Sequence, residues 1–308
     1  MTQLVLEQAL NGLQFGLMLF LLAAGLTLVF GIMDMINLAH GSLYMIGAYL
    51  AAAVGAATGS FWAGVLAAAG GTALVGALLE VVLLRRFYAR DHLSQVLATF
   101  ALILIANEVV RMIWGPQPVM LSMPEALSGP VELNVMNVEL AYPAYRLLII
   151  GVGIAVAALL WLLVTRTRAG MWVRAGAANR EMTQQLGVDV RRLFTALFAV
   201  GSALAALAGA FLGPLLAVQV GMGENILILA FVVVVIGGIG SIRGALIGAV
   251  LVGCIDTLGR SLLQHALREV LPPQWASAAG PAFASIAVYV FMAAVLALKP
   301  QGLFPVRA

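Results

Sequence analysis

A short polar stretch interrupts the long apolar N-terminal part of the chain. Asp34 opens the polar residues of this stretch, and the residues that could line a path for a solute are Asn37, His40, Gly41, Ser42 and Tyr44. A spacing of three predicts that Asp34, Asn37 and His40 share one face of a helix. Polar groups at membrane depth are tolerated where they face protein or a water-filled cavity. The stretch therefore predicts a section of a translocation path; for His40 alone, the commoner role of a packed or capping histidine stays open.

A second break lies in the C-terminal half, between Ile236 and Gly248. Gly238 and Gly240 are its path candidates. Glycines at 240, 244 and 248 recur every four residues, a spacing that lets helix backbones approach closely. Both breaks precede a helix rich in small residues, as in transporters that are built from internal repeats. Surface turns with tight helix packing are the alternative interpretation.

A third segment, from Arg174 to Asp189, is short and polar, and its composition favours a helix that ends near Gly187. Met182 and Leu186 fall on one face of that helix. A helix with an apolar stripe and several arginines could dock in a groove of a cytoplasmic partner. The candidate contact residues are Arg174, Ala178, Asn179, Arg180, Glu181, Met182, Leu186 and Gly187. The alternative is a positively charged loop without a partner.

The composition places all three segments in a membrane protein. Hydrophobic residues make up 63% of the 308 residues and charged residues only 9%, whereas about a quarter of a soluble domain is charged. Lysine occurs once, at Lys299, so the basic stripe of a nucleic-acid-binding protein is absent. Cys254 is the single cysteine, which excludes an intrachain disulfide and a cysteine-based metal site.

Apolar runs of about 20 residues predict an all-α integral membrane protein with about 8–10 transmembrane helices in a single domain over 1–308. The runs are Leu10–Met33, two within Met35–Leu79 that Gly55–Ser60 separates, Leu93–Met112, Leu147–Thr165, Leu193–Gly213, Asn225–Ile242, Gly244–Leu263 and Phe283–Leu298. Broken helices are expected near 33–42 and 236–244. The segment Met1–Ala9 contains no basic residue, so we expect the first run to be retained rather than cleaved as a signal peptide.

Arginine bias predicts the orientation of the chain. Basic residues cluster at 85–90, at 166–192 and around the last span, at Lys299 and Arg307. Placing the three clusters in the cytoplasm agrees with nine crossings, an N-terminus outside and a C-terminus inside. The long loop 114–145 then lies outside, and the loop 166–192 lies inside.

The sequence lacks the motifs of several enzyme classes. A nucleotide-binding P-loop needs a lysine followed by Ser or Thr, but Lys299 is followed by Pro300. The three histidines, His40, His92 and His265, lie far apart, and no zinc-helix or serine-elbow motif occurs. We therefore expect a non-enzyme without a bound cofactor or metal.

Several short motifs follow one another along nearly the whole chain. They are Gly25–Gly31 (GLTLVFG), Ile36–Gly41 (INLAHG), Tyr44 with Gly47–Tyr49, the inner loop with Arg174, Asn179-Arg180 and Leu186–Val188, Gly237–Ala245 (GGIGSIRGA) and Lys299–Phe304 (KPQGLF). With these motifs the sequence resembles the membrane permeases of the branched-chain amino acid ATP-binding-cassette importers. It departs from them at Met182-Thr183, where the family commonly has small residues.

The resemblance implies a permease subunit, in the bacterial inner membrane, that moves branched-chain or related amino acids inward by alternating access. It implies a second, homologous but unlike permease subunit, two cytoplasmic ATPases that bind ATP, and a periplasmic solute-binding protein. The loop 166–192 would be the coupling segment that contacts an ATPase. Because the family includes importers of urea, short amides and aromatic compounds, those substrates stay open. A permease for simple sugars, a membrane-embedded enzyme and a stand-alone channel are the further alternatives.

Overall fold

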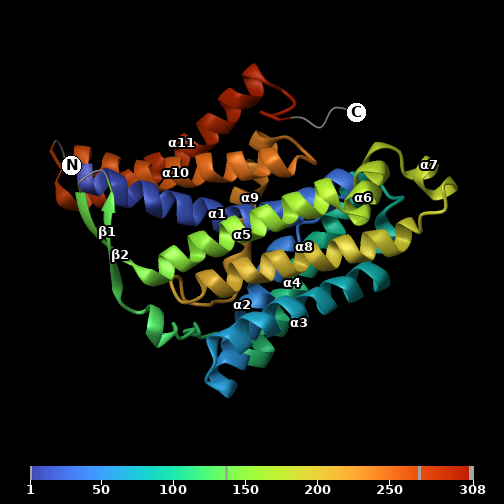
Figure 1. The fold of residues 1–308 in the computed structure, drawn as a ribbon, viewed down its shortest axis with the longest axis horizontal. Helices are drawn as coiled ribbons and strands as arrows, with labels where there is room; N and C mark the ends of the chain where they lie inside the picture. Colours follow the sequence, from blue (N-terminus) through green and yellow to red (C-terminus); the bar gives the residue numbers. More distant parts are fainter. Residues whose placement is uncertain (1, 136–137, 270–271, 305–308) are drawn as a thin grey trace.

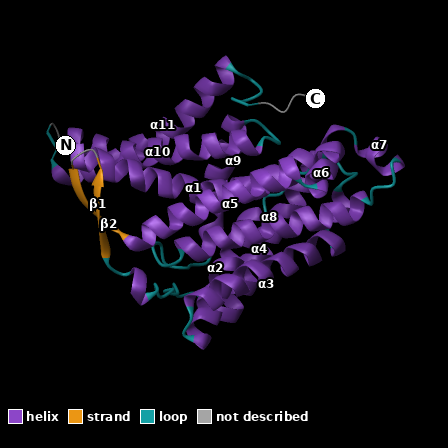
Figure 2. Cartoon of the chain, in the orientation of Figure 1, coloured by secondary structure: helices purple, strands orange, loops and turns teal. Residues whose placement is uncertain are grey.

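A computed structural model describes residues 2–135, 138–269 and 272–304. It is a bundle of long helices with a two-stranded hairpin at one end (Figures 1 and 2). The α-helices are α1 (Thr2–Met33), α2 (His40–Thr58), α3 (Phe61–Val82), α4 (His92–Trp114), α5 (Ala144–Arg166), α6 (Arg168–Ala178), α7 (Arg180–Gln185), α8 (Val190–Leu212), α9 (Met222–Gly237), α10 (Ile242–Leu267) and α11 (Pro273–Leu298). The other elements are the 3-10 turns η1 (Leu84–Phe87) and η2 (Glu125–Leu127) and the strands β1 (Pro130–Val135) and β2 (Val138–Pro143).

The expected all-α membrane architecture is confirmed. Within the described ranges, eight helices are long and apolar enough to cross a membrane, and α9 is a shorter apolar helix. The N-terminus and the β1–β2 hairpin lie at one end of the bundle, and α6 and α7 lie at the other (Figure 1). The chain is therefore a multi-pass membrane protein.

Helix α1 lies at the centre of the bundle, with α5, α8, α9 and α10 packed around it. A helix that is apolar on all sides belongs in the interior, and α1 carries no charge between Gln8 and Met33. Its contact with α10 is unusually close. A Cβ atom on Gly12 would lie 2.8 Å from the Cα atom of Cys254, and one on Gly253 would lie 2.5 Å from the Gly12 carbonyl oxygen. Small residues let the two backbones touch, as in other membrane bundles.

The first expected break is confirmed between α1 and α2. Asp34 adopts a left-handed φ of 50° directly after α1, and α2 begins only at His40. The His40 ring lies beside Gly25, where a Cβ atom would come within 2.8 Å of Nε2. Gly25 precedes Met33 by about 12 Å along the helix axis. The chain therefore turns back, and α2 starts inside the bundle rather than at its surface.

The second expected break is confirmed between α9 and α10. Helix α9 stops at Gly237, five residues before the predicted end of that span, because Gly238 and Gly240 adopt φ values of 100° and 80°. The Ser241 side chain then caps α10 by accepting a hydrogen bond from the Gly244 N–H at 3.1 Å. Two glycines in the left-handed region thus produce a tight turn between two apolar helices.

The loop 114–145 contains a hairpin that the apolar runs of the sequence did not predict. Strands β1 and β2 pair antiparallel, with Pro130 opposite Pro143. Val119 forms a separate bridge with Val218, so the loop also contacts the segment before α9. Residues 130–135 (PVELNV) and 138–143 (VELAYP) alternate apolar and polar side chains over part of their length, and this period of two is the signal that could have revealed the strands.

The loop 166–192 forms two helices rather than one. Asn179 has an extended backbone (φ −155°), and its Oδ1 accepts a hydrogen bond from the Met182 N–H at 2.9 Å. An asparagine at this position favours an N-cap over a continuous helix, so α6 ends before it and α7 begins after it. Gly187 follows α7 with a φ of 86°, which confirms the predicted stop.

Candidate solute path and inner coupling surface

The polar residues of the first break lie deep in the protein. Asn37 and His40 are fully buried, and the Asn37 Oδ1 accepts a hydrogen bond from the Ala39 N–H at 3.0 Å. The Leu22 carbonyl lies near the His40 ring. Within the described residues, neither His40 nitrogen nor the Asn37 Nδ2 has a partner in hydrogen-bond geometry. Buried polar groups without a partner are rare, so these two side chains are distinct from ordinary packing residues.

Gly41, Ser42 and Tyr44 are buried in the first turns of α2. A Cβ atom on Gly41 would lie 2.4 Å from the Gly223 carbonyl oxygen, so α2 and α9 meet backbone to backbone here. Likewise, a Cβ atom on Gly209 would lie 2.2 Å from the Tyr44 carbonyl oxygen. These residues therefore form the junction of α2 with α8 and α9.

The predicted common face of Asp34, Asn37 and His40 is wrong. Residues 34–39 are not helical, so helical spacing does not apply to them. Asp34 is exposed, whereas the other two side chains point into the bundle. The positive φ at Asp34 separates its side chain from the buried pair.

The structure brings the two breaks together. A Cβ atom on Gly31 would lie 2.3 Å from the Cα atom of Gly240. Gly238 is buried against the C-terminal segment, where the Leu303 and Phe304 N–H groups donate to the carbonyls of Ile236 and Gly237 at 2.8 and 3.0 Å. Of the glycine candidates of the second break, Gly240 therefore contacts the end of α1, next to the first break, whereas Gly238 lies against the C-terminal segment.

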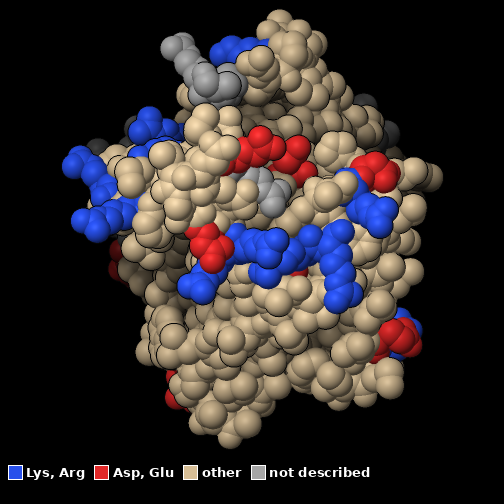
Figure 3. Space-filling view, turned by 90° about the vertical axis from the view of Figure 1, so that its right-hand side faces the viewer, with Lys and Arg blue, Asp and Glu red and all other residues tan. Residues whose placement is uncertain are grey.

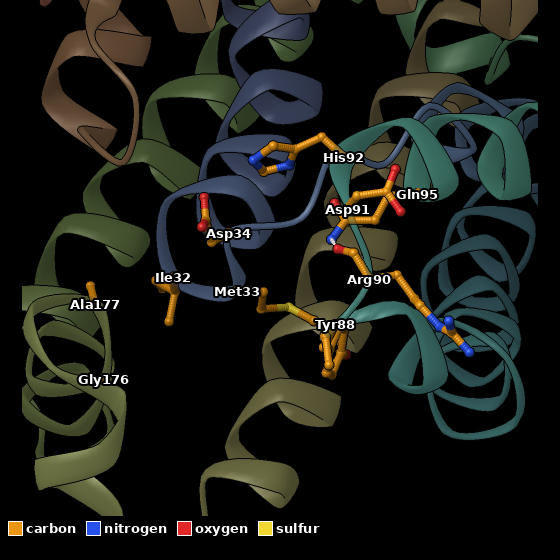
Figure 4. A pocket seen from close by; sticks show the side chains of 11 residues that line it. Ile32, Met33, Asp34, Tyr88, Arg90, Asp91, His92, Gln95, Gly176 and Ala177 are labelled. Carbon is orange, nitrogen blue, oxygen red and sulfur yellow. Dashed lines mark hydrogen bonds between the residues drawn. The ribbon is translucent and has the colours of Figure 1, made fainter.

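An open hollow of about 480 Å³ lies beside the first break, among the end of α1, the start of α4 and α6 (Figure 4). Its lining residues are Ile32, Met33, Asp34, Tyr88, Ala89, Arg90, Asp91, His92, Gln95, Gly176 and Ala177. The buried Gln95 ties the break to this region, because its Oε1 accepts from the Ile36 N–H and its Nε2 donates to the Phe87 carbonyl, each at 3.2 Å. Hydrogen bonds from the Ser94 hydroxyl and N–H hold the pKa of Asp91 below its ordinary value, so this carboxylate at the rim of the hollow favours its charged form.

A buried carboxylate fixes the inner end of α3 to α8. Glu80 is fully buried and accepts hydrogen bonds from Arg85 at 3.2 and 2.9 Å, from the Tyr88 hydroxyl at 2.7 Å and from the Thr195 hydroxyl at 2.7 Å. Burying a charge is costly unless it is paired and hydrogen-bonded, and here both conditions hold. The network anchors the start of α8, which directly follows the inner loop.

Side chains of the loop itself fix α6 beneath α5. Arg174 donates a hydrogen bond to the Val164 carbonyl near the end of α5, which is a capping role at a helix C-terminus. A Cβ atom on Gly176 would lie 3.7 Å from Leu193 Cδ2 and 4.0 Å from Ile32 Cγ2, so this turn of α6 lies close to α8 and α1. Of the predicted contact residues, Arg174 thus has a partner within its own chain.

The tip of the inner loop is apolar and exposed. Met182 and Leu186 of the α7 turn are 55% and 77% exposed, and Met171 and Trp172 of α6 are also exposed. Ala178, Asn179, Glu181 and Gly187 are exposed beside them; the Arg180 side chain lies outside the described part of the chain. Figure 3 looks onto this end of the bundle and shows Lys and Arg side chains in bands across it. Large exposed apolar side chains within a basic surface are typical of a protein contact.

Comparison with known proteins assigns the family. A family model described as "Branched-chain amino acid transport system / permease component" matches residues 8–298. The chain belongs to this family. The match covers both breaks, the inner loop and nearly all the helices, so the whole transmembrane bundle is a permease component of this type.

Relatives of the permease cover most of its length. It is 31% identical over 283 residues to the high-affinity branched-chain amino acid transport permease BraD of Pseudomonas aeruginosa, covering 86% of this chain and 90% of BraD. It is 30% identical to LivH of Escherichia coli K12 over 86% of this chain and 89% of LivH. The fructose import permease FrcC of Rhizobium meliloti is 35% identical, but over only 38% of this chain and 32% of FrcC.

Proposed function

We propose that this permease is the membrane-spanning subunit of an ATP-binding-cassette importer for branched-chain or related amino acids. The similarity to BraD and LivH over 86% of the chain carries the proposal. The shorter similarity to a fructose permease favours amino acids over sugars, because it leaves most of the chain unmatched. Since the sequence has no P-loop lysine, we assign ATP hydrolysis to partner subunits.

The assembly would contain a second, homologous permease, two cytoplasmic ATPases and a periplasmic solute-binding protein. The loop 166–192 is the proposed coupling segment. Met182 and Leu186 supply exposed apolar contacts at its tip, where a groove of an ATPase subunit would bury them. The basic clusters support an orientation with this end in the cytoplasm and with the loop 114–145 outside.

The contacts of α6 suggest how movement of the ATPases would reach the path. Helix α6 contacts α1, and Gly176 lies close to Ile32, next to Gly31. Gly31 in turn contacts Gly240 at the second break. A displacement of α6 would therefore shift the junction of the two breaks, beside which Asn37 and His40 are buried. Such a rigid-body movement is the kind that switches transporters between outward- and inward-facing states.

Affinity purification through a C-terminal tag tests the assembly. After mild solubilisation we expect an ATPase and a second permease to be recovered with this chain. Uptake by cells that carry the complex should then be inhibited by leucine or valine and not by urea, acetamide or benzoate. Recovery of the chain alone would contradict the importer and favour a channel; inhibition by urea or acetamide instead would assign an amide substrate.

A further inference from the structure

A strip of polar side chains lies on the outside of the apolar helix bundle. On α4, Asn107, Glu108 and Arg111 share one helical face, and on α9, Glu224 and Asn225 occupy the first turn. The Asn107 Nδ2 donates to the Glu224 Oε1 at 2.7 Å, and Arg111 pairs with Glu108 at 3.1 Å. We name these five residues the α4–α9 strip. All of them except the half-buried Asn107 are exposed.

The position of Asn107 on α4 places the strip at membrane depth. Helix α4 begins at His92, beside the inner hollow, and Asn107 follows about 22 Å further along its axis. The helix ends at Trp114, whose ring packs against Tyr49 with centroids 5.2 Å apart. Because Tyr49 precedes the end of α2 at Thr58 by about 13 Å, α4 ends well short of the outer end of its neighbour.

The contacts of α9 give the same depth independently. Gly223, next to Glu224, packs backbone to backbone on Gly41. Gly41 lies in the first turn of α2, which begins inside the bundle beside Gly25. The apolar layer of a bilayer is about 30 Å thick. Both helices therefore place the strip inside that layer rather than at a water-exposed end.

Lipid is an unsuitable neighbour for these groups. A charged side chain at the centre of a membrane helix is costly to insert, and the strip contains two carboxylates and a guanidinium. Other outward faces are apolar, such as that of α5 with the exposed side chains Ile154 and Leu159. Intramembrane charges normally face a water-filled cavity or the bundle interior. The strip must therefore be covered by something other than lipid.

We propose that the α4–α9 strip is a wall of the solute path, with Glu224 as the group that receives the ammonium group of an amino acid. The assignment rests on the proposed function, in which a second permease subunit would close the path from the opposite side. Glu108 and Arg111 neutralise each other, whereas Glu224 forms no ion pair among the described residues and is bound only by the Asn107 amide. The strip thus carries a net negative charge at Glu224.

The neighbouring side chains fit an amino acid with an apolar side chain. Leu104 and Ile228, each one turn from the strip residues on its own helix, are exposed beside it. Arg111 pairs with Glu108 through Nη1, and the other N–H groups of its guanidinium could donate to a substrate carboxylate, while Glu224 provides an anion for the ammonium group. A zwitterion with an aliphatic side chain would therefore find all three kinds of contact on this wall.

Thiol labelling in the assembled complex tests whether the strip faces water. Asn225→Cys and the control Ile154→Cys are each built into a Cys254→Ser background, and a permanently cationic methanethiosulfonate reagent is added to vesicles. We expect labelling of Asn225→Cys to be on the order of tenfold faster, because only the thiolate reacts and apolar surroundings suppress it. Leucine should slow this labelling. Equal, slow labelling at both sites would overturn the proposal.

A charge test addresses Glu224 itself. Asn225→Cys is labelled with a cationic and with an anionic reagent, and the two rates are compared. Because local negative charge concentrates cations, the ratio of the cationic to the anionic rate should fall several-fold when Glu224→Gln is added. The ratio should stay unchanged when Glu132→Gln is added instead. An unchanged ratio with Glu224→Gln would overturn the role of this carboxylate. ATP-dependent uptake is measured in the same vesicles. ATP-dependent uptake without fast labelling of Asn225→Cys contradicts only the proposal that the strip lines the path. Fast labelling without ATP-dependent uptake contradicts the proposed importer function and indicates a water-filled path that works without ATP.

Discussion

Gly31 of α1 and Gly240 of the α9–α10 turn pack against each other through their backbones, so that a Cβ atom on Gly31 would lie 2.3 Å from the Gly240 Cα. The contact joins two chain breaks that are more than 200 residues apart in sequence. The end of α1 also lies against α6, where Ile32 and Gly176 line the same hollow. This junction is therefore the place where a movement of the inner loop would reach the interior of the bundle.

A methyl group at Gly31 should disturb this junction. Gly31→Ala forces backbone atoms apart, and overpacking of this kind costs about 1–3 kcal/mol. The matched control is Gly70→Ala in α3, where a Cβ atom meets nothing within 4 Å. We expect a lower midpoint of thermal unfolding in detergent and slower uptake for Gly31→Ala only. Equal midpoints and equal uptake for both variants would show that the contact has no role.

Asn37 and His40 are predicted to act in transport beyond their packing. In the double variant Asn37→Ala/His40→Ala, uptake should fall on the order of tenfold, the loss expected when about 1.4 kcal/mol of interaction is removed from the limiting step. Recovery of the ATPase in a pull-down should stay unchanged, because the inner loop is intact. Uptake at the wild-type rate would assign both residues to packing.

The exposed apolar residues Met182 and Leu186, in the loop 166–192, are predicted to be required for binding of the ATPase. Met182→Asp places a charge where an apolar contact is proposed, and losing a central interface contact costs about 2 kcal/mol or more. Met120→Asp is the same change at an exposed methionine of the outer loop and serves as the control. ATPase recovery should fall with Met182→Asp and with Leu186→Asp, and persist with Met120→Asp. Undiminished recovery in all three would assign the loop no part in the contact.

The orientation can be tested with two single cysteines in the Cys254→Ser background. Ser128 lies in the outer loop and Gln185 at the end of α7, and both are exposed. A membrane-impermeant maleimide added to spheroplasts should label Ser128→Cys at once and Gln185→Cys only after permeabilisation. The reverse pattern would invert the topology that the arginine bias predicts.

The sequence predicts the bundle well because membrane spans are set by length and hydropathy, as in Leu10–Met33 and α1. It also locates both breaks, since Asp34 and the glycines at 238 and 240 disrupt apolar helices. The sequence does not predict local backbone geometry. The positive φ of Asp34 separates its side chain from that of Asn37, so the two do not share a helical face. The sequence fails, too, for contacts between distant residues, since nothing in it predicts that Asn107 bonds Glu224.

The central claim, that this permease serves an ATP-driven importer of branched-chain amino acids, is tested most directly by leucine transport in proteoliposomes. The co-purified complex is reconstituted with the ATPases facing the medium, so that ATP added outside drives leucine out of vesicles loaded with the binding protein and radiolabelled leucine. We predict that leucine leaves the vesicles with ATP and is retained with a non-hydrolysable ATP analogue. Release of leucine at the same rate without ATP would contradict the account and identify a passive channel.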